Sequence, residues 1–144
     1  MVADMKTLAI SLCSVILALS FSSCGLLKGK YDKNHADTVS YIGDKKSSSA
    51  QINVEGLWYS PEWGIVVFDQ QPNGKLTGIF RDYYTVNGVV SGKKIFIALV
   101  DDDWTEYTVE LSRKNSETLT GYYSSYVPFS EEDKLPLTLK RISL

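Results

Sequence analysis

Short runs of alternating apolar and polar residues dominate the chain from residue 54 onward. In the run 106–111, Tyr107, Val109 and Leu111 stand between polar neighbours. A period of two places one side of a strand in a core and the other in water. Turn residues separate the runs, and Asn87-Gly88 carries the strongest short hairpin signal because a type I′ turn needs positive φ twice. The pattern predicts strands over 56–60, 64–70, 75–83, 85–90, 94–100, 104–112, 117–126 and 135–141.

An internal repeat supports closure of these strands into one sheet. The sequence LTGIF at 76–80 recurs as LTGYY at 119–123, each copy after a strand led by Trp63 or Trp104. The glycine of each copy lets a neighbouring backbone or a large side chain pass close by. Two such units predict an all-β fold, a small antiparallel up-and-down β-barrel of about eight short strands, because closure removes exposed sheet edges. An open meander or a small β-sandwich is the alternative.

The side chains predicted to face inward are bulky. Short strands and large residues favour a barrel filled by its own side chains over one that encloses a ligand cavity. The predicted inward residues are Trp58, Leu76, Phe80, Tyr107, Val109, Leu111, Leu135, Leu137 and Leu139.

The first residues read as an export signal. Lys6 precedes an apolar run over 8–21, which ends in Phe21-Ser22-Ser23-Cys24. The run is too short to span a bilayer, and a charge, a short apolar region and small residues in this order are typical of a secretory signal. The segment resembles a bacterial lipoprotein signal, and Phe21-Ser22-Ser23-Cys24 is similar to the lipobox.

That resemblance implies cleavage before Cys24 and a lipid on its sulfur, so that the chain would be anchored in a membrane of the bacterial cell envelope. An ordinary secretory signal with a chance cysteine is the alternative. By the same resemblance, Gly25 after the modified cysteine favours the outer membrane, with the protein facing the periplasm.

The chain divides into three predicted parts. We expect the lipoprotein signal peptide at 1–23, the lipidated cysteine with a flexible tether at 24–51, and the β-barrel domain at 52–144. The stretch 44–51 is polar and cannot bury enough surface to offset its ordering entropy. The single histidine, His35, lies in the predicted tether, where we expect it to be exposed to solvent.

The first and last strands carry a second resemblance. Gly56-Leu57-Trp58 opens the first strand and Arg141 closes the last. This arrangement resembles the calycin group, which includes the lipocalins and avidins. The resemblance covers about 54–142 and implies that Trp58 packs against Arg141 and seals one end of the barrel.

Catalytic and metal-binding residue types are scarce. No cysteine follows Cys24, His35 lies before the predicted barrel, and no Gly-x-Ser-x-Gly occurs. A serine nucleophile would lack its base and zinc would lack its ligands, so we expect no enzyme, no metal and no cofactor. The acidic run 101–103 is typical of a solvated turn. The net charge of −2, without a basic stripe, argues against nucleic acid as a partner.

Aromatic residues remain as candidates for binding. Trp63, Trp104 and Phe129 stand near predicted strand ends or in loops, where exposed rings often anchor partners. The alternative is that the aromatic residues cover the rim of the small barrel or form cross-strand pairs. The sequence therefore favours a non-catalytic binding or interaction module of the cell envelope, with an inhibitor as one form and an envelope protein or polymer as partner. The alternative is a calycin-like carrier of a small apolar ligand.

Overall fold

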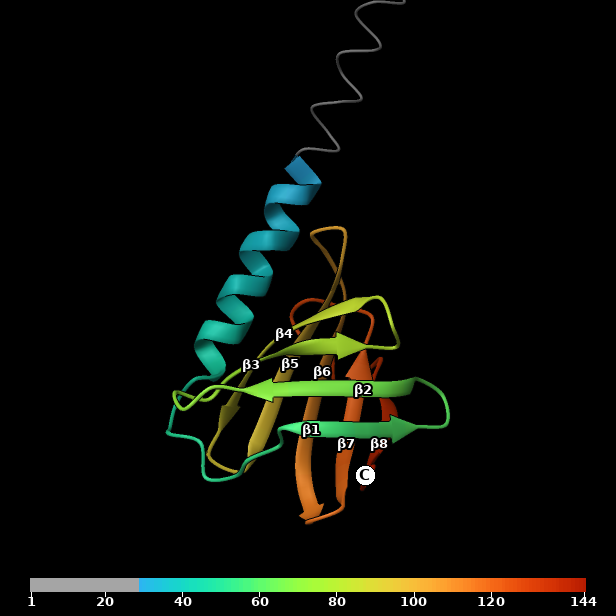
Figure 1. Ribbon diagram of the computed structural model, residues 1–144. Helices are drawn as coiled ribbons and strands as arrows, with labels where there is room; N and C mark the ends of the chain where they lie inside the picture. The colour runs from blue at the N-terminus through green and yellow to red at the C-terminus, as the bar shows by residue number, and fades with distance from the viewer. Residues whose placement is uncertain (1–28) are drawn as a thin grey trace, which may run out of the picture. The chain divides into compact units, whose positions relative to one another are not determined.

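Eight antiparallel strands form a closed up-and-down barrel, as the sequence predicts (Figure 1). The computed structural model describes residues 29–144. Each strand pairs with the next in sequence, and β8 returns to β1. Within this range, a helix over residues 29–45 precedes the barrel. The strands are β1 (Gly56–Ser60), β2 (Gly64–Gln70), β3 (Lys75–Phe80), β4 (Tyr84–Ser91), β5 (Lys94–Asp101), β6 (Trp104–Asn115), β7 (Thr118–Ser124) and β8 (Leu135–Arg141).

The tight hairpin turns are formed by residues other than Asn87-Gly88, which carries the strongest hairpin signal in the sequence. Arg81 and Asp82, with φ of 53° and 65°, turn the chain between β3 and β4, and the acidic run 101–103 forms the β5–β6 turn. Asn87-Gly88 was expected to turn but lies inside β4, so that prediction is wrong. The reason is steric: a Cβ on Gly88 would lie 2.7 Å from the carbonyl oxygen of Phe96 on the neighbouring strand.

The two repeated glycines stand where neighbouring strands approach most closely. A Cβ on Gly78 would lie 1.9 Å from the carbonyl oxygen of Val67, and a Cβ on Gly121 would lie 1.9 Å from that of Glu110. Real side chains cannot approach so closely. The repeat therefore marks two places where the barrel wall curves tightly enough to exclude any side chain.

The barrel interior is packed with apolar side chains. Every strand contributes side chains to this core. Among the residues predicted to face inward, Leu135 does not, because it lies at the start of β8 and is 53% exposed. Dense packing by large side chains is the filled form of an eight-stranded barrel. The largest fully buried residues are Trp58, Phe68, Phe80, Leu76, Ile95, Ile97, Leu99, Leu111, Leu119, Leu139, Val54 and Val66.

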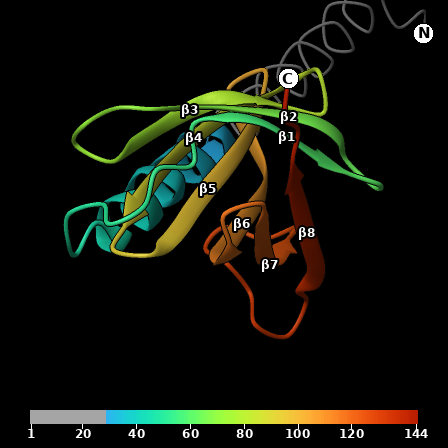
Figure 2. The same cartoon turned by 60° about the horizontal axis from the view of Figure 1, so that its bottom comes forward.

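Residues 34–45 of the helix dock on the outside of the barrel, against β4 to β6 (Figure 2). A flexible coil is therefore wrong for this stretch, whereas the packing of Tyr41 on the barrel, which the sequence also allows, is observed. Thr38 and Tyr41 are buried, whereas His35 is exposed as expected. The polar stretch that follows is also ordered: the backbone N–H of Gly92 donates to Ser49, and that of Gln51 donates to Gly92.

The seam between the first and last strands is short. Within the described chain, β1 and β8 pair at Trp58 with Arg141 and at Tyr59 with Lys140. The other seven strand pairs each extend over five or more residues of register. Next to these pairs, the backbone N–H of Ile142 donates to the carbonyl oxygen of Leu57 at 2.9 Å, and the Arg141 side chain donates to that of Glu55.

Candidate functional site

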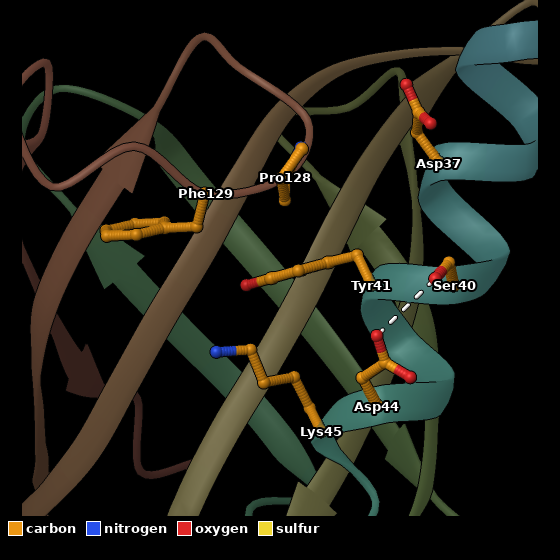
Figure 3. A pocket seen from close by; sticks show the side chains of 7 residues that line it. All are labelled: Asp37, Ser40, Tyr41, Asp44, Lys45, Pro128 and Phe129. Atoms are coloured by element: carbon orange, nitrogen blue, oxygen red, sulfur yellow. Dashed lines mark hydrogen bonds between the residues drawn. The ribbon is translucent and has the colours of Figure 1, made fainter.

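A hollow of about 460 Å³ lies between the docked helix and the β7–β8 loop (Figure 3). From the helix, Tyr41 and Lys45 point toward the loop, and Phe129 lies opposite them. The hollow thus joins an aromatic wall to charged and hydroxyl groups. Its lining residues are Asp37, Ser40, Tyr41, Asp44, Lys45, Pro128 and Phe129.

Asn34 fixes the start of the docked stretch. Its side-chain oxygen accepts from the backbone N–H of Thr105 at 2.8 Å, and its amide donates to the Thr105 carbonyl at 3.1 Å. The Asn34 side chain thus bonds both backbone groups of Thr105, as a neighbouring strand would, next to the register shift between Leu99 and Val100. The hydroxyls of Thr38 and Thr105 bond at 2.7 Å one helical turn later. The helix is therefore positioned by polar contacts.

Glu110 fixes the other end of the docked stretch. The Tyr41 hydroxyl donates to Glu110 Oε1 at 3.3 Å, and Lys45 Nζ lies 3.0 Å from the same oxygen. Lys45 also lies over the rings of Tyr41 and Phe96, at 5.5 and 5.0 Å from their centroids. Burial, followed by the Glu110 carboxylate, raises the pKa of Tyr41 well above its usual range, so this hydroxyl stays protonated.

A second hollow, of about 530 Å³, lies on the outer face of β5 to β8 and includes Glu110. Tyr122 is 44% exposed there, with the Lys134 ammonium 4.4 Å from its ring centroid. Lys134 also pairs with Glu131. Because Tyr41 and Lys45 of the first hollow bond to Glu110 of the second, the two hollows adjoin. We call the pair the outer groove.

The three aromatic candidates fall in three different environments. Phe129 lines the outer groove, as a binding residue could. Trp104 is half-buried at the start of β6 and does not line either hollow of the outer groove. Trp63 is only 5% exposed, so an exposed binding role is wrong for it and the alternative, that it covers the end of the barrel, fits.

The β1–β2 turn folds the Trp63 ring into the mouth of the barrel. The ring makes edge contacts with Tyr123, Tyr107 and Phe80 at centroid distances of 5.0, 5.2 and 5.3 Å. The perpendicular geometry places positive ring edges on negative faces. Trp63 is therefore a plug of the barrel, and it offers little surface to a partner.

The residues of the calycin resemblance meet near the β1–β8 seam. The Arg141 guanidinium lies 4.2 Å from the Trp58 ring centroid and donates to the carbonyl oxygen of Glu55 at 2.9 Å. A Cβ on Gly56 would lie 2.9 Å from the Arg141 Nη1. Glycine at 56 therefore makes room for the arginine, and the three residues form one structural unit.

Among residues 29–144 no group of three His, Cys, Asp or Glu residues could hold a metal ion. Over the same range, no helix combines the length and the apolar character that a bilayer span requires. Cys24 and the predicted signal peptide lie outside the described residues.

The chain matches no protein-family model. It also matches no curated protein and no solved structure at the significance we required. The barrel architecture therefore stands on the structure alone.

Proposed function

We propose that the chain is a lipid-anchored, non-catalytic binding module of the bacterial cell envelope. Its partner, an envelope protein or polymer, occupies the outer groove between residues 34–45 and the β7–β8 loop. The anchor is the diacylglyceryl group on Cys24, and the protein faces the periplasm from the outer membrane. No catalytic step is assigned to any residue.

One observation carries the choice of binding module over carrier: the barrel interior is filled. A carrier of a small ligand needs an apolar cavity of roughly 300 Å³ or more. The core side chains and the Trp63 plug occupy the space where such a ligand would lie. A binding surface then has to be on the outside, where the outer groove offers both hollows and aromatic rings.

The outer groove has the mixed character of a polar binding site. Phe129 and Tyr122 provide flat apolar surface, and Ser40, Asp44 and Lys134 provide hydrogen-bonding and charged groups. Rigid aromatic rings with polar neighbours bind at a low entropic cost.

Photo-crosslinking in intact cells tests the groove. Phe129 is replaced by benzoylphenylalanine in the full chain, with the exposed His35 replaced in a control. We expect a discrete adduct from position 129, absent from position 35 and lost when Ser40→Trp fills the groove. If the partner is a polymer, the chain sediments with isolated cell-wall sacculi, and Ser40→Trp abolishes this. Failure of both assays would refute the groove as the binding site.

A separate measurement tests the anchor. Cells grown with an alkyne-labelled palmitate are expected to label the parent chain and Cys13→Ala but not Cys24→Ala. Label that persists in Cys24→Ala would overturn the lipidation proposal and leave the groove assay unaffected. The two parts of the proposed function can therefore fail independently.

A further inference from the structure

Two neighbouring tyrosines and a glutamate form a hydrogen-bonded chain at the mouth of the barrel. The Tyr83 hydroxyl donates to the Tyr84 hydroxyl at 3.2 Å, and the Tyr84 hydroxyl donates to Glu106 Oε2 at 2.8 Å. Tyr83 is 51% exposed, whereas Tyr84 is 4% exposed. The chain therefore leads from a phenol that solvent reaches, through a buried phenol, to the carboxylate of a half-buried glutamate. We call these three residues the tyrosine relay.

Two departures from regular strand geometry bring the relay together. Adjacent residues of a strand face opposite sides of the sheet, so their hydroxyls normally lie far apart. Tyr83 instead belongs to the turn between β3 and β4, and its ring centroid lies 4.3 Å from that of Tyr84. On β6, the register shift opposite Leu99 and Val100 leaves Glu106 as the extra residue of a β-bulge. A bulge re-aims a side chain, and here it directs the carboxylate to Tyr84.

The relay supplies what one-electron oxidation of a phenol requires, a base for the proton. A phenol that has lost an electron is a strong acid, so the electron leaves readily only if a base accepts the proton in the same step. Glu106 is such a base and is reached through Tyr84. Burial raises the pKa of Tyr84 well above its usual range, so this hydroxyl keeps a proton that it can pass on. A positioned base typically accelerates proton transfer by about 10²–10⁴-fold.

Exposure alone does not distinguish Tyr83 from other surface tyrosines. Tyr59 and Tyr126 are 46% and 56% exposed, and the value for Tyr83 lies between these two. Among residues 29–144, no protein group bonds to the hydroxyl of Tyr59 or Tyr126, so water has to accept the proton there. A preference of an oxidant for Tyr83 would therefore report its connection to Glu106.

We propose that Tyr83 is an oxidative modification site, at which nitrogen dioxide, a small one-electron oxidant, removes an electron while Tyr84 and Glu106 carry the proton away. Nitrogen dioxide becomes nitrite, the Tyr83 proton passes to the Tyr84 oxygen, and the Tyr84 proton passes to the Glu106 carboxylate. A neutral Tyr83 phenoxyl radical remains, and Glu106 returns its proton to water. A second nitrogen dioxide bonds to the ring carbon beside the phenolic oxygen. That carbon then loses its proton and the oxygen regains one, which gives 3-nitrotyrosine.

Nitration of the purified full chain by a limiting dose of nitrogen dioxide tests the proposal, which depends neither on the outer groove nor on the lipid anchor. The reagent is uncharged, so the neighbouring charges of Arg81 and Asp82 do not attract it. Peptide mapping by tandem mass spectrometry measures nitration at Tyr83, with Tyr59 and Tyr126 as internal references. We expect Tyr83 to carry at least about fivefold more nitration than either reference.

Two substitutions interrupt the relay and keep Tyr83. Glu106→Gln retains the shape of the side chain without its charge, and Tyr84→Phe removes only the connecting hydroxyl. Each is expected to lower nitration at Tyr83 to the level of Tyr126, with nitration of Tyr126 unchanged. Glu62→Gln is the matched control, because Glu62 is an exposed carboxylate in the turn between β1 and β2 and lies outside the relay. We expect Glu62→Gln to leave the preference for Tyr83 intact.

Three results would overturn the proposal. A ratio of Tyr83 to Tyr126 nitration below fivefold would show that the relay gives no useful advantage. A preference for Tyr83 that survives either Glu106→Gln or Tyr84→Phe would show that proton transfer to the carboxylate is not its cause. An equal loss in Glu62→Gln would assign the effect to the local charge. If Glu106→Gln does not accumulate as folded protein, Tyr84→Phe decides alone, because it keeps the packed ring.

Discussion

Gly121→Ala tests how tightly the barrel wall is packed. The new Cβ would lie 1.9 Å from the carbonyl oxygen of Glu110 and 2.9 Å from the Cα of Leu111. Normal contact needs about 3.5 Å, so β6 and β7 would have to separate by roughly 1.5 Å at this point. Overpacking costs about 1–3 kcal/mol, and the loss of about two ladder hydrogen bonds adds about 1 kcal/mol each. We therefore expect Gly121→Ala to lower the free energy of unfolding by about 3–5 kcal/mol.

Urea unfolding followed by tryptophan fluorescence measures this loss. With a slope of about 1–3 kcal/mol per molar urea, the midpoint should fall by about 2 M. Gly43→Ala is the control, because Gly43 lies in the helix with no atom within 4 Å of the new Cβ. There alanine should raise stability by up to about 1 kcal/mol through its helix propensity. A loss below about 1 kcal/mol for Gly121→Ala would refute the close approach of β6 and β7.

Four other substitutions give measurable outcomes. Trp63→Ala should cost about 3–5 kcal/mol of unfolding free energy and weaken the near-ultraviolet circular dichroism of the ring cluster, while a cost below 1 kcal/mol would exclude the plug. Burial raises the pKa of both Tyr41 and Tyr84, so stability is complete below about pH 10 and falls as pH rises above it. Tyr41→Phe and Tyr84→Phe should flatten that fall in urea midpoints measured from pH 8 to 11, and an unchanged slope would contradict the assignment. Asn34→Ala removes two bonds to Thr105 and should cost about 1–3 kcal/mol in urea unfolding, and no loss would show that the helix does not depend on them.

The strands could be predicted from the sequence because each carries its own signal. The predicted bounds of β1, β2 and β8 agree with the structure to the residue: period-two alternation marks β8, and turn residues delimit β1 and β2. Turn residues also separate the other strands, within a few positions of their observed ends. The predicted turn at Asn87-Gly88 is wrong because glycine occurs both where a turn needs positive φ and where a neighbouring backbone passes closely. The local sequence does not distinguish these two cases. Only the neighbouring strand reveals which one applies, through the carbonyl of Phe96.

The docking of the helix and the burial of Trp63 could not be predicted from local sequence patterns. Asn34, Thr38, Tyr41 and Lys45 share one helical face, but most of them are polar and give no apolar period of 3.6. Their docking depends on Thr105 and Glu110, which are distant in sequence. For Trp63, alternation stops at the turn, so nothing local shows that the ring folds inward. Phe129 could be named as a candidate, but its groove exists only because the helix docks.

The short seam between β1 and β8 makes the barrel unequal around its circumference. Two register pairs, the backbone hydrogen bond from Ile142 to Leu57 and the stacked Arg141 hold the first and last strands of the sheet together. If the seam opens, the meander becomes an unrolled sheet with two free edges, and each edge can accept a strand from another chain. The main effect of losing Arg141 would therefore be exchange of β1 or β8 between molecules, and the loss of folding stability would be secondary. By holding the seam closed, the arginine prevents that intermolecular pairing.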